Sequence, residues 1–565
     1  MKTKWQLIAN FITRNKLIVS IAFFSGLIYN IITLLIPISL GRFYEFNFGF
    51  SSHRLKLLKT VPFISTEKFS EFLLFFIGLV LIRFIFEYIN RYVISIIGER
   101  FAKNLREKLF EHQLQINTSI YDQKGIGKYL LRYSGDLKSI QNYVTKGLFR
   151  FLQDLILIVI LISAITYINL NFGFIVALFI SIAVLLLFFI NNILYSISVS
   201  RRNQRSAMLT FVNTRLRAIL SIKAFNKYTP EKKRYNKRSD KLYHVGEKYQ
   251  QVISLIQTIV PTITYLMLGL LMWYIYYLKT TDLAVFNSSE FLILILIIIS
   301  FLPILRRTLR VSIIWKLGNI SFQKLLNIFN LGAENKLTYK KSDLSSNKLF
   351  LKNVTFKYSS SRNFVFEGLN ITILPKKTTL ITGGSGTGKN TFINLLLKIY
   401  NPTEGIIKFG KYNYNNLSEK TIRKNISVIS DEYPLYGRTV YEAIAYSRSK
   451  ETEIKASKIL KKLQHFENKK DKLELRDSIG DLGSKLTSGQ KKILMYCRAL
   501  LTNKPILIID RPFEGLNIET KIHLQSILDS LRFKKTLLVL DLVTPKGLKI
   551  DYHYTLNNLT IAKQP

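Results

Sequence analysis

The stretch Gly383-Gly384-Ser385-Gly386-Thr387-Gly388-Lys389-Asn390-Thr391 decides how the C-terminal part of the chain folds. It follows the apolar run 379–382 and leads into an apolar-periodic segment that begins at Phe392. A glycine-rich loop between a strand and a helix turns backbone N–H groups onto a phosphate, and the lysine reaches the outer phosphates. The sequence therefore predicts nucleotide binding in an α/β domain of the phosphate-loop type.

One position of this loop departs from the usual pattern. Asn390 stands where a Ser or Thr hydroxyl normally binds Mg²⁺, and it offers only an amide oxygen. Further along, the apolar run 507–509 ends in Asp510, and a carboxylate in this place holds the metal through water. We therefore expect Mg²⁺ near Asn390 and Asp510, and we expect hydrolysis to be impaired.

Composition indicates a membrane protein with more than one domain. The chain has 565 residues, of which 48% are hydrophobic, and one core seldom serves so long a chain. All the runs that are long enough to cross a bilayer lie in the first 320 residues. These six runs are 17–39, 72–97, 149–168, 172–194, 252–278 and 291–313. We therefore expect six transmembrane helices, followed by a soluble domain.

The formal net charge of +45 gathers beside these runs. The connection 98–150 holds ten Lys/Arg against five Asp/Glu, and the connection 194–251 holds fourteen against three. Because basic connections stay on the cytoplasmic side, we place both of them, both termini and the nucleotide-binding domain in the cytoplasm. We expect no nucleic-acid partner, and the single Cys497 excludes an intrachain disulfide.

The apolar runs include charged residues, among them Arg83, Glu87 and Asp154. Arg83 and Glu87 are one helical turn apart in the second run, and Asp154 lies near the start of the third. Ionisable groups at such places belong either to a substrate path or to an ion pair that neutralises them. The sequence leaves both interpretations open.

The order of motifs resembles that of an ATP-binding cassette (ABC) transporter, of the exporter type in which one membrane domain is fused to one nucleotide-binding domain. Leu486-Thr487-Ser488-Gly489-Gln490 lies between the glycine loop and Asp510, as the signature of that family does. In the membrane half, Gly98 through Asp136 and Ile222-Lys223-Ala224-Phe225 follow its two cytoplasmic loops. The resemblance implies a membrane domain over 1–320, a linker over 321–347 and a nucleotide-binding domain over 348–565. It also implies short coupling helices near 113–124 and 213–222.

The resemblance implies roles for individual residues. Tyr358 stacks on adenine, and Asp510 is linked to the metal. The phosphate loop, Gly383, Ser385, Gly386, Thr387, Gly388, Lys389, Asn390 and Thr391, binds ATP. The signature residues Thr487, Ser488, Gly489 and Gln490 close over the γ-phosphate that the second subunit binds, although Ser488 adds a side chain where the family has glycine.

The departures from the family fall on the groups that hydrolyse ATP. Arg511 replaces the catalytic glutamate and cannot accept a proton. Asp431 replaces the glutamine that senses Mg²⁺, and Leu542 replaces the histidine that positions the γ-phosphate, unless the register shifts to Asp541. Asn517 stands for the aspartate of the loop that crosses to the partner, and Glu514 is an alternative base. We expect this chain to bind ATP with little turnover.

These features predict a subunit of an ABC exporter in the inner membrane of a bacterium. We expect a heterodimer in which a second half-transporter hydrolyses ATP and this chain's signature completes that partner's site. A homodimer that uses Asp431, Glu514 or Asp541 in catalysis is one alternative. A non-hydrolysing membrane regulator or receptor is another, and the substrate stays unknown.

Overall fold

The computed structural model divides the chain into two compact units. It describes residues 3–48, 69–124, 129, 132–281, 295–299, 303–304, 307–308, 310–332, 348–359, 361–445, 449–467, 472–557 and 560–563. The first unit comprises Met1–Leu114 and Ile126–Leu331, and the second comprises Gln115–Gly125 and Gly332–Pro565. Each unit is described by itself below.

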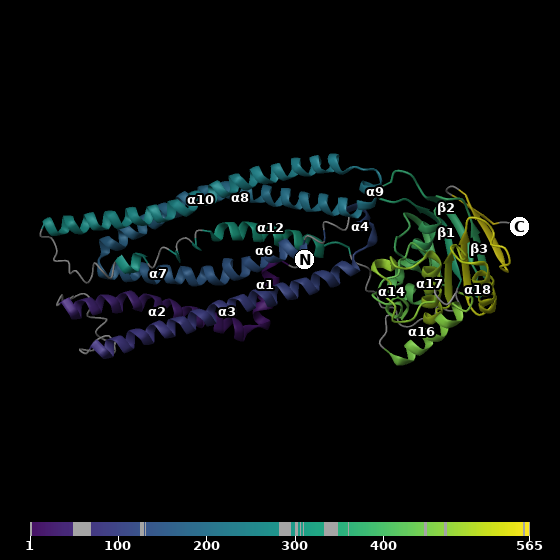
Figure 1. Cartoon of the computed structure of the whole chain (residues 1–565), viewed down its shortest axis with the longest axis horizontal. Coiled ribbons are helices and arrows are strands. Elements are labelled where there is room, and N and C mark those ends of the chain that lie inside the picture. Colours follow the sequence, from purple (N-terminus) through teal and green to yellow (C-terminus); the bar gives the residue numbers. More distant parts are fainter. Residues whose placement is uncertain are drawn as a thin grey trace. The chain divides into compact units, whose positions relative to one another are not determined.

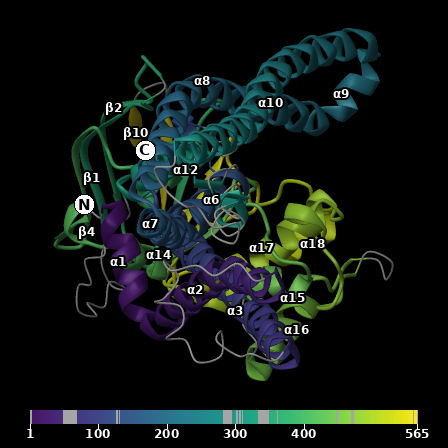
Figure 2. The same cartoon turned by 90° about the vertical axis from the view of Figure 1, so that its left-hand side faces the viewer.

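The first unit is helical, and its long helices lie side by side (Figures 1 and 2). Its α-helices are α1 (Lys4–Arg14), α2 (Lys16–Phe48), α3 (Phe69–Gln115), α6 (Leu137–Asn142), α7 (Phe151–Ile168), α8 (Leu170–Arg217), α9 (Ile219–Ala224), α10 (Tyr228–Thr280) and α12 (Val311–Phe329). Two π-helical turns, η2 (Arg132–Asp136) and η3 (Tyr143–Arg150), lead into α6 and α7. Because α12 continues the helical unit to Leu331, that unit extends past residue 320.

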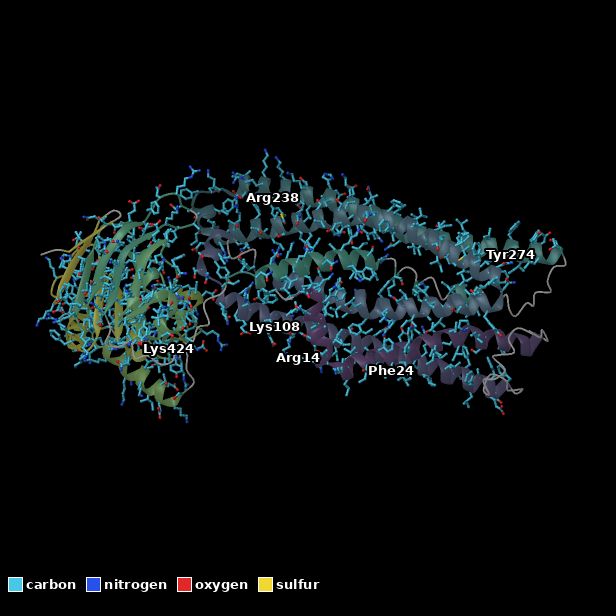
Figure 3. All side chains as sticks on the ribbon, turned by 180° about the vertical axis from the view of Figure 1, so that it is seen from behind. Arg14, Phe24, Lys108, Arg238, Tyr274 and Lys424 are labelled. Atoms are coloured by element: carbon cyan, nitrogen blue, oxygen red, sulfur yellow. The ribbon has the colours of Figure 1, made fainter. Side chains whose placement is uncertain are left out.

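Among the described residues, five helical segments are long and apolar enough to cross a membrane: Lys16–Leu40, Phe69–Gln115, Leu137–Tyr167, Leu170–Arg217 and Tyr228–Leu278. They coincide with the first five apolar runs of the sequence. Much of the sixth run, 291–313, lies outside the described residues. Helix α10 is polar in its N-terminal part and apolar in its C-terminal part; Figure 3 labels Arg238 in the first and Tyr274 in the second. A helical membrane domain is therefore confirmed.

The second unit contains two sheets (Figure 1). The antiparallel sheet has the order β2-β1-β4-β5, formed by β1 (Leu349–Phe356), β2 (Phe366–Ile373), β4 (Glu404–Phe409) and β5 (Tyr412–Asn413). The larger sheet has the order β10-β9-β3-β8-β7-β6, formed by β3 (Thr378–Thr382), β6 (Ile426–Ile429), β7 (Ile506–Asp510), β8 (Thr536–Asp541), β9 (Tyr552–Leu556) and β10 (Ile561–Lys563). All its pairs except β10 with β9 are parallel.

Helices complete this α/β unit. They are α4 (Thr118–Lys124), α13 (Lys389–Leu396), α14 (Glu419–Asn425), α15 (Val440–Ala445), α16 (Lys450–Leu463), α17 (Ser488–Thr502) and α18 (Ile518–Leu531), with the short turns η4 (Tyr414–Asn416) and η5 (Asp481–Gly483). Strands β3 and β7 are buried at every position, as is typical of central parallel strands covered on both faces. Helix α4 belongs to this unit although the chain enters it from α3.

Candidate functional site

The carboxyl ends of four parallel strands meet at one edge of the larger sheet. Thr382 at the end of β3 is paired with Asp541 at the end of β8, and Asp510 at the end of β7 is paired with Leu540. Strand β6 ends beside them at Ile429. Ligands of such sheets bind at this edge. The glycine loop, Asp431, Asp510, Arg511 and Leu542 therefore lie together at this edge.

The glycine loop wraps the end of Lys389. The buried ammonium group donates hydrogen bonds to the carbonyl oxygens of Gly383 and Gly384, both at 2.6 Å. Thr387 donates to the carbonyl of Gly384 at 3.0 Å, whereas Ser385 and Asn390 are exposed. Burial lowers the pKa of Lys389, and Asp510 partly offsets that effect. The loop thus positions the ammonium group of Lys389 where it can bind a phosphate.

Two glycines of the loop have left-handed backbone. Gly388 has φ +96°, and an added Cβ would lie 2.7 Å from Val365 and 2.8 Å from Phe366. Gly386 has φ +84°, but a Cβ there would meet nothing within 4 Å. Only glycine adopts such angles at low cost. Gly388 is therefore required both by its backbone angle and by the close packing around it.

A cavity of about 580 Å³ opens at this loop. It is lined by Thr382, Gly383, Gly384, Thr387, Leu542, Thr555, Leu556 and Asn557. The exposed apolar side chain of Leu542 lies where the sequence predicted a missing histidine. Asp541 accepts a hydrogen bond from the backbone N–H of Leu542 at 2.7 Å, and burial raises its pKa. Neither side chain offers the imidazole that positions a γ-phosphate.

Arg511 carries a guanidinium group at the position next to Asp510. It pairs with Glu514 at 3.2 Å, and this hydrogen bond raises the pKa of Arg511. Its backbone has φ +48°, which non-glycine residues rarely adopt. The alternative base that the sequence offered, Glu514, is therefore engaged in an ion pair with Arg511.

The expected Mg²⁺ ligands divide into two groups. Asp431 is paired with the buried ammonium group of Lys492, at 3.4 Å, and Lys492 also donates to the backbone carbonyl of Asp510 at 3.3 Å. The carboxylate of Asp510 accepts a hydrogen bond from Ser430 at 2.9 Å, and the amide of Asn390 is exposed. Mg²⁺ prefers oxygen donors and keeps waters and phosphates as further ligands. Asp510 and Asn390 fit this role, whereas Asp431 is turned to Lys492.

Tyr358 lies beside the helix that follows the glycine loop. Its hydroxyl shares a hydrogen bond of 2.8 Å with Thr391, and its ring meets that of Tyr400 edge to face at 5.3 Å. Tyr400 in turn donates a short hydrogen bond to Asp122 on α4. The aromatic side chain at the expected adenine position is thus connected, through Tyr400, to α4, a short helix within the segment 113–124 where a coupling helix was expected.

The signature residues form the first turn of α17. Thr487 and Gln490 cap the helix reciprocally, through hydrogen bonds of 3.2 and 3.0 Å between side chain and backbone. A Cβ on Gly489 would lie 2.8 Å from the carbonyl oxygen of Gly515, so glycine is required there. Ser488 is accommodated because its hydroxyl occupies the space left by the absent side chain of Gly515, which has φ +77°. The start of the signature helix is therefore intact despite the substitution.

Several contacts of the site were missed from the sequence. Lys492 interrupts the apolar face of α17, and this was the signal that could have drawn attention to it. Ser430 and the Tyr400–Asp122 contact leave no local sequence pattern. Asn517 caps α18 by accepting from the backbone of Thr520 at 2.7 Å, which gives it a structural role within its own subunit.

The helical unit carries a second candidate site. Arg307 pairs with Asp154, its Nε lying 2.7 Å from one carboxylate oxygen, and Arg83 pairs with Glu87 at 3.6 Å. Glu87 also pairs with Arg91. The ion-pair interpretation of these intramembrane charges is therefore supported by geometry.

Beside these pairs lies a cavity of about 770 Å³ that is rich in cations. It is lined by Lys146, Arg150, Gln257, Pro303, Arg307, Arg310, Val311 and Ile314. Among the described residues no acid lines it, and neither Lys146 nor Arg150 forms a hydrogen bond or ion pair through its side chain. The Nε of Arg310 is buried and has no hydrogen-bond partner in the described part of the chain.

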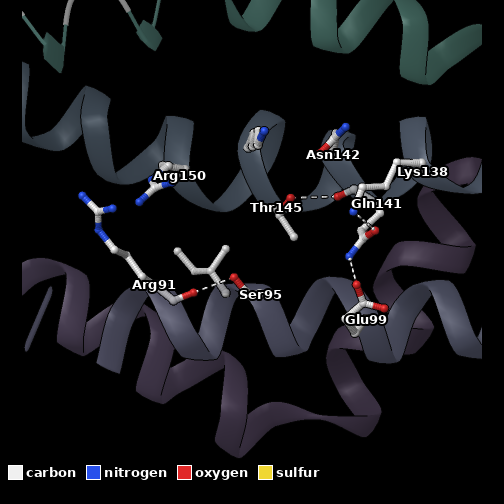
Figure 4. A pocket seen from close by; sticks show the side chains of 10 residues that line it. Arg91, Ser95, Glu99, Lys138, Gln141, Asn142, Thr145 and Arg150 are labelled. Atoms are coloured by element: carbon white, nitrogen blue, oxygen red, sulfur yellow. Dashed lines mark hydrogen bonds between the residues drawn. The ribbon is translucent and has the colours of Figure 1, made fainter. Parts of the chain in front are cut away.

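Lys146 and Arg150 also line a neighbouring cavity of about 390 Å³ (Figure 4). There Glu99 accepts a hydrogen bond from Gln141 at 2.8 Å, and Ser95 donates one to the backbone of Arg91 at 2.8 Å. In Figure 4 Arg150 lies at the same end of the cavity as Arg91, away from Glu99 and Gln141. Ionisable groups inside membrane helices are costly and mark functional positions.

Comparison with known proteins decides the family. Residues 19–304 match the family described as "ABC transporter transmembrane region", and residues 366–514 match "ABC transporter". The chain belongs to the ABC transporters. With a helical membrane domain fused to a nucleotide-binding domain, it is a subunit of the exporter type, as the motif order predicted, and a multi-pass membrane protein.

Relatives of this ABC transporter span most of its length. A protein of Haemophilus influenzae (strain 86-028NP) is 24% identical over 523 residues, which cover 91% of this chain and 84% of the relative. One of Pasteurella multocida (strain Pm70) is 25% identical and covers 85% of this chain and 82% of the relative. A protein of Salmonella typhimurium is 25% identical over 467 residues, which cover 82% of this chain and 80% of the relative. All three are named "ATP-dependent lipid A-core flippase".

Proposed function

We propose that this exporter subunit binds ATP at its own glycine loop and does not hydrolyse it. The observation that carries the proposal is Arg511, which stands beside Asp510 and is engaged with Glu514. A guanidinium group cannot take a proton from water, and removal of a general base commonly lowers a rate by roughly 10²–10⁴. Leu542 stands where the family has the histidine that positions the γ-phosphate, so a second group needed for hydrolysis is missing. Replacing Arg511 alone would therefore not restore hydrolysis.

Nucleotide affinity survives because it depends on other groups. Lys389, the glycine backbone and Tyr358 supply contacts to phosphates and adenine that need no proton transfer. The amide oxygen of Asn390 and, through water, the carboxylate of Asp510 would hold Mg²⁺. When bound, Mg²⁺ neutralises part of the charge of the phosphates.

The second subunit completes the proposal. A signature helix whose first turn is capped and closely packed remains able to close over a nucleotide held by a partner. We therefore favour a heterodimer in which a second half-transporter hydrolyses ATP. A homodimer that uses unconventional groups is less favoured, because Asp431 and Glu514 are both paired with cations. If this chain is instead a non-hydrolysing membrane regulator, its own site is equally inert, but it has no partner subunit that hydrolyses ATP.

Phosphate release by purified full-length chain in nanodiscs tests the inert site. We expect a rate at background for the wild type and also for Arg511→Glu, with ATP binding retained in both. Robust turnover by the wild type, unchanged by Arg511→Glu, would contradict the proposal.

Cross-linking tests the pairing. The native Cys497 is buried, so the double variant Ser385→Cys, Ser488→Cys presents the accessible thiols. A nucleotide sandwich between two copies of this chain brings one subunit's glycine loop to the other's signature and permits a disulfide. We expect no cross-linked dimer of the purified chain when ATP is added. Efficient cross-linking would favour the homodimer, and the single variants Ser385→Cys and Ser488→Cys are the controls.

The cavity of the membrane unit supports an anionic amphiphile as the cargo. Lys146, Arg150, Arg307 and Arg310 line it together with the apolar side chains of Val311 and Ile314. Such a lining suits a phosphorylated headgroup with an apolar tail, and the relatives are named for a lipid flippase activity. We propose that the protein works in a bacterial inner membrane and moves such a lipid.

Binding of a short-chain lipid tests the cargo class. We expect full-length protein in detergent to bind dioctanoyl phosphatidic acid more tightly than dioctanoyl phosphatidylcholine. Arg150→Gln should weaken the first and leave the second unchanged, because the side chain of Arg150 lines the cavity and forms no hydrogen bond or ion pair among the described residues. Equal affinity for the two lipids in the wild type would contradict this part of the proposal.

A further inference from the structure

The cations of the large membrane cavity differ in one respect. Arg307 forms an ion pair with a counter-ion among the described residues, whereas Lys146, Arg150 and Arg310 form no ion pair there. That counter-ion, Asp154, is only 3% exposed, but the side chain of Arg307 is 34% exposed. The pair therefore has a buried acidic end and a basic end that reaches the cavity.

The geometry of this pair resembles that of a guanidinium group with a phosphate. Arg307 contacts Asp154 through two nitrogens, the Nε at 2.7 Å and the Nη2 at a shorter distance. A phosphate headgroup offers the same two-oxygen acceptor to the same fork of donors. A headgroup and Asp154 consequently compete for one guanidinium group.

Asp154 lies outside the large cavity that would hold the headgroup. It lies on the first turn of α7 and lines a small cavity of about 10 Å³ with Tyr29, Glu87, Arg91 and others, and it is absent from the lining of the large one. Arg150, one turn earlier in the chain, and Arg307 line the same small cavity. The buried carboxylate of Asp154 therefore lies close to two of the cations that line the large cavity.

We propose that Asp154 is a positioning residue that sets the selectivity of the cavity for anionic headgroups. In the absence of cargo it holds Arg307 in place and satisfies its charge. Because a headgroup takes Arg307 only by displacing Asp154, the carboxylate weakens the binding of strongly anionic headgroups and so limits the preference for them over zwitterionic ones. The inference rests on the proposed anionic cargo.

Calorimetric titration of full-length protein with dioctanoyl phosphatidic acid and dioctanoyl phosphatidylcholine tests the role of Asp154. Asp154→Asn keeps the shape and one acceptor oxygen but removes the competing charge. We expect it to tighten phosphatidic acid binding about tenfold and to leave phosphatidylcholine binding unchanged. Asp154→Glu, which keeps the charge, should behave as the wild type, and so should Glu107→Gln, which removes a carboxylate from an exposed pair with Lys103.

The outcomes separate the possible roles of Asp154. If it only stabilises the fold, Asp154→Asn will shift both lipid affinities in parallel or leave both unchanged, and either result overturns the inference. If Asp154→Asn does not fold, Asp154→Ser provides the same neutral test with a smaller side chain. A wild type that binds the two lipids equally would overturn the anionic cargo itself. A wild type with clear preference, unaltered in Asp154→Asn, would overturn only the role of Asp154.

Discussion

The glycine loop and the strand ends beside it belong to one sheet edge, yet they differ in the chemical groups that they offer to a nucleotide. Around the loop, Lys389 is buried against glycine carbonyls and Gly388 fits closely between its neighbours. At the ends of β6, β7 and β8, the acidic groups Asp431 and Glu514 are paired with cations, and Leu542 is apolar. Binding and hydrolysis depend on separate groups, so one can be lost without the other.

Loss of the loop's lysine should have the largest effect on this contrast. Lys389→Ala removes a charge-assisted hydrogen bond to the phosphates, worth about 1.5–3 kcal/mol, and should weaken ATP binding roughly 10–100-fold. Equilibrium titration with a fluorescent ATP analogue measures this change. Lys408→Ala, which removes an exposed lysine elsewhere in the domain, should bind as the wild type does. Unchanged affinity in Lys389→Ala would mean that ATP does not occupy the loop.

The loop's backbone should be the next most sensitive feature. Gly388→Ala places a Cβ against Val365 and Phe366 in a left-handed backbone, whereas Gly386→Ala adds only the backbone strain of about 1–2 kcal/mol. We expect Gly388→Ala to weaken ATP binding at least tenfold and Gly386→Ala to weaken it less. Equal effects in the same titration would show that the packing around Gly388 is unimportant.

ATP binding should weaken at alkaline pH, because Lys389 then loses its proton. Burial lowers the pKa of this lysine, so the ammonium group is lost at a lower pH than for an ordinary lysine. Below that pKa the charge is present and binding is full, and above it the affinity falls by at most about tenfold per pH unit. Titrations between pH 7 and 10 measure the decline. Lys389→Arg stays charged and should show a flat profile, so a decline of equal size in both would contradict the assignment.

Removal of Mg²⁺ should have the smallest effect. Because Asn390 offers an amide and Asp431 is paired with Lys492, the protein contributes little to holding the metal. We expect EDTA to weaken ATP binding about threefold or less. In Asn390→Ser, which restores a hydroxyl, the same treatment should weaken binding more. A large loss on chelation in the wild type would show that Asp510 and Asn390 suffice to bind Mg²⁺ strongly.

The sequence predicted the features of the site that follow from local pattern. A glycine loop after a buried strand and Asp510 at the end of another predicted the sheet edge, because carboxyl ends of parallel strands converge. The six apolar runs predicted a helical membrane domain, although much of the last lies outside the described residues.

Contacts between segments that are distant in the chain could not be predicted from the sequence. Nothing local indicates that Lys492 faces Asp431, that Gly515 makes room for Ser488, or that Asp154 meets Arg307 across 153 positions of the chain. Each depends on side-chain packing that only the assembled unit provides. The cation-lined cavity likewise combines residues from η3 and from both sides of the start of α12.

The nucleotide recovered from the protein tests the central claim most directly. Full-length chain in nanodiscs would be incubated with ATP and Mg²⁺ for an hour, freed of unbound nucleotide and denatured, and the released nucleotide separated by chromatography. The account predicts nucleotide in near-stoichiometric amount, recovered as ATP. Recovery mainly as ADP, with phosphate released in proportion, would contradict it.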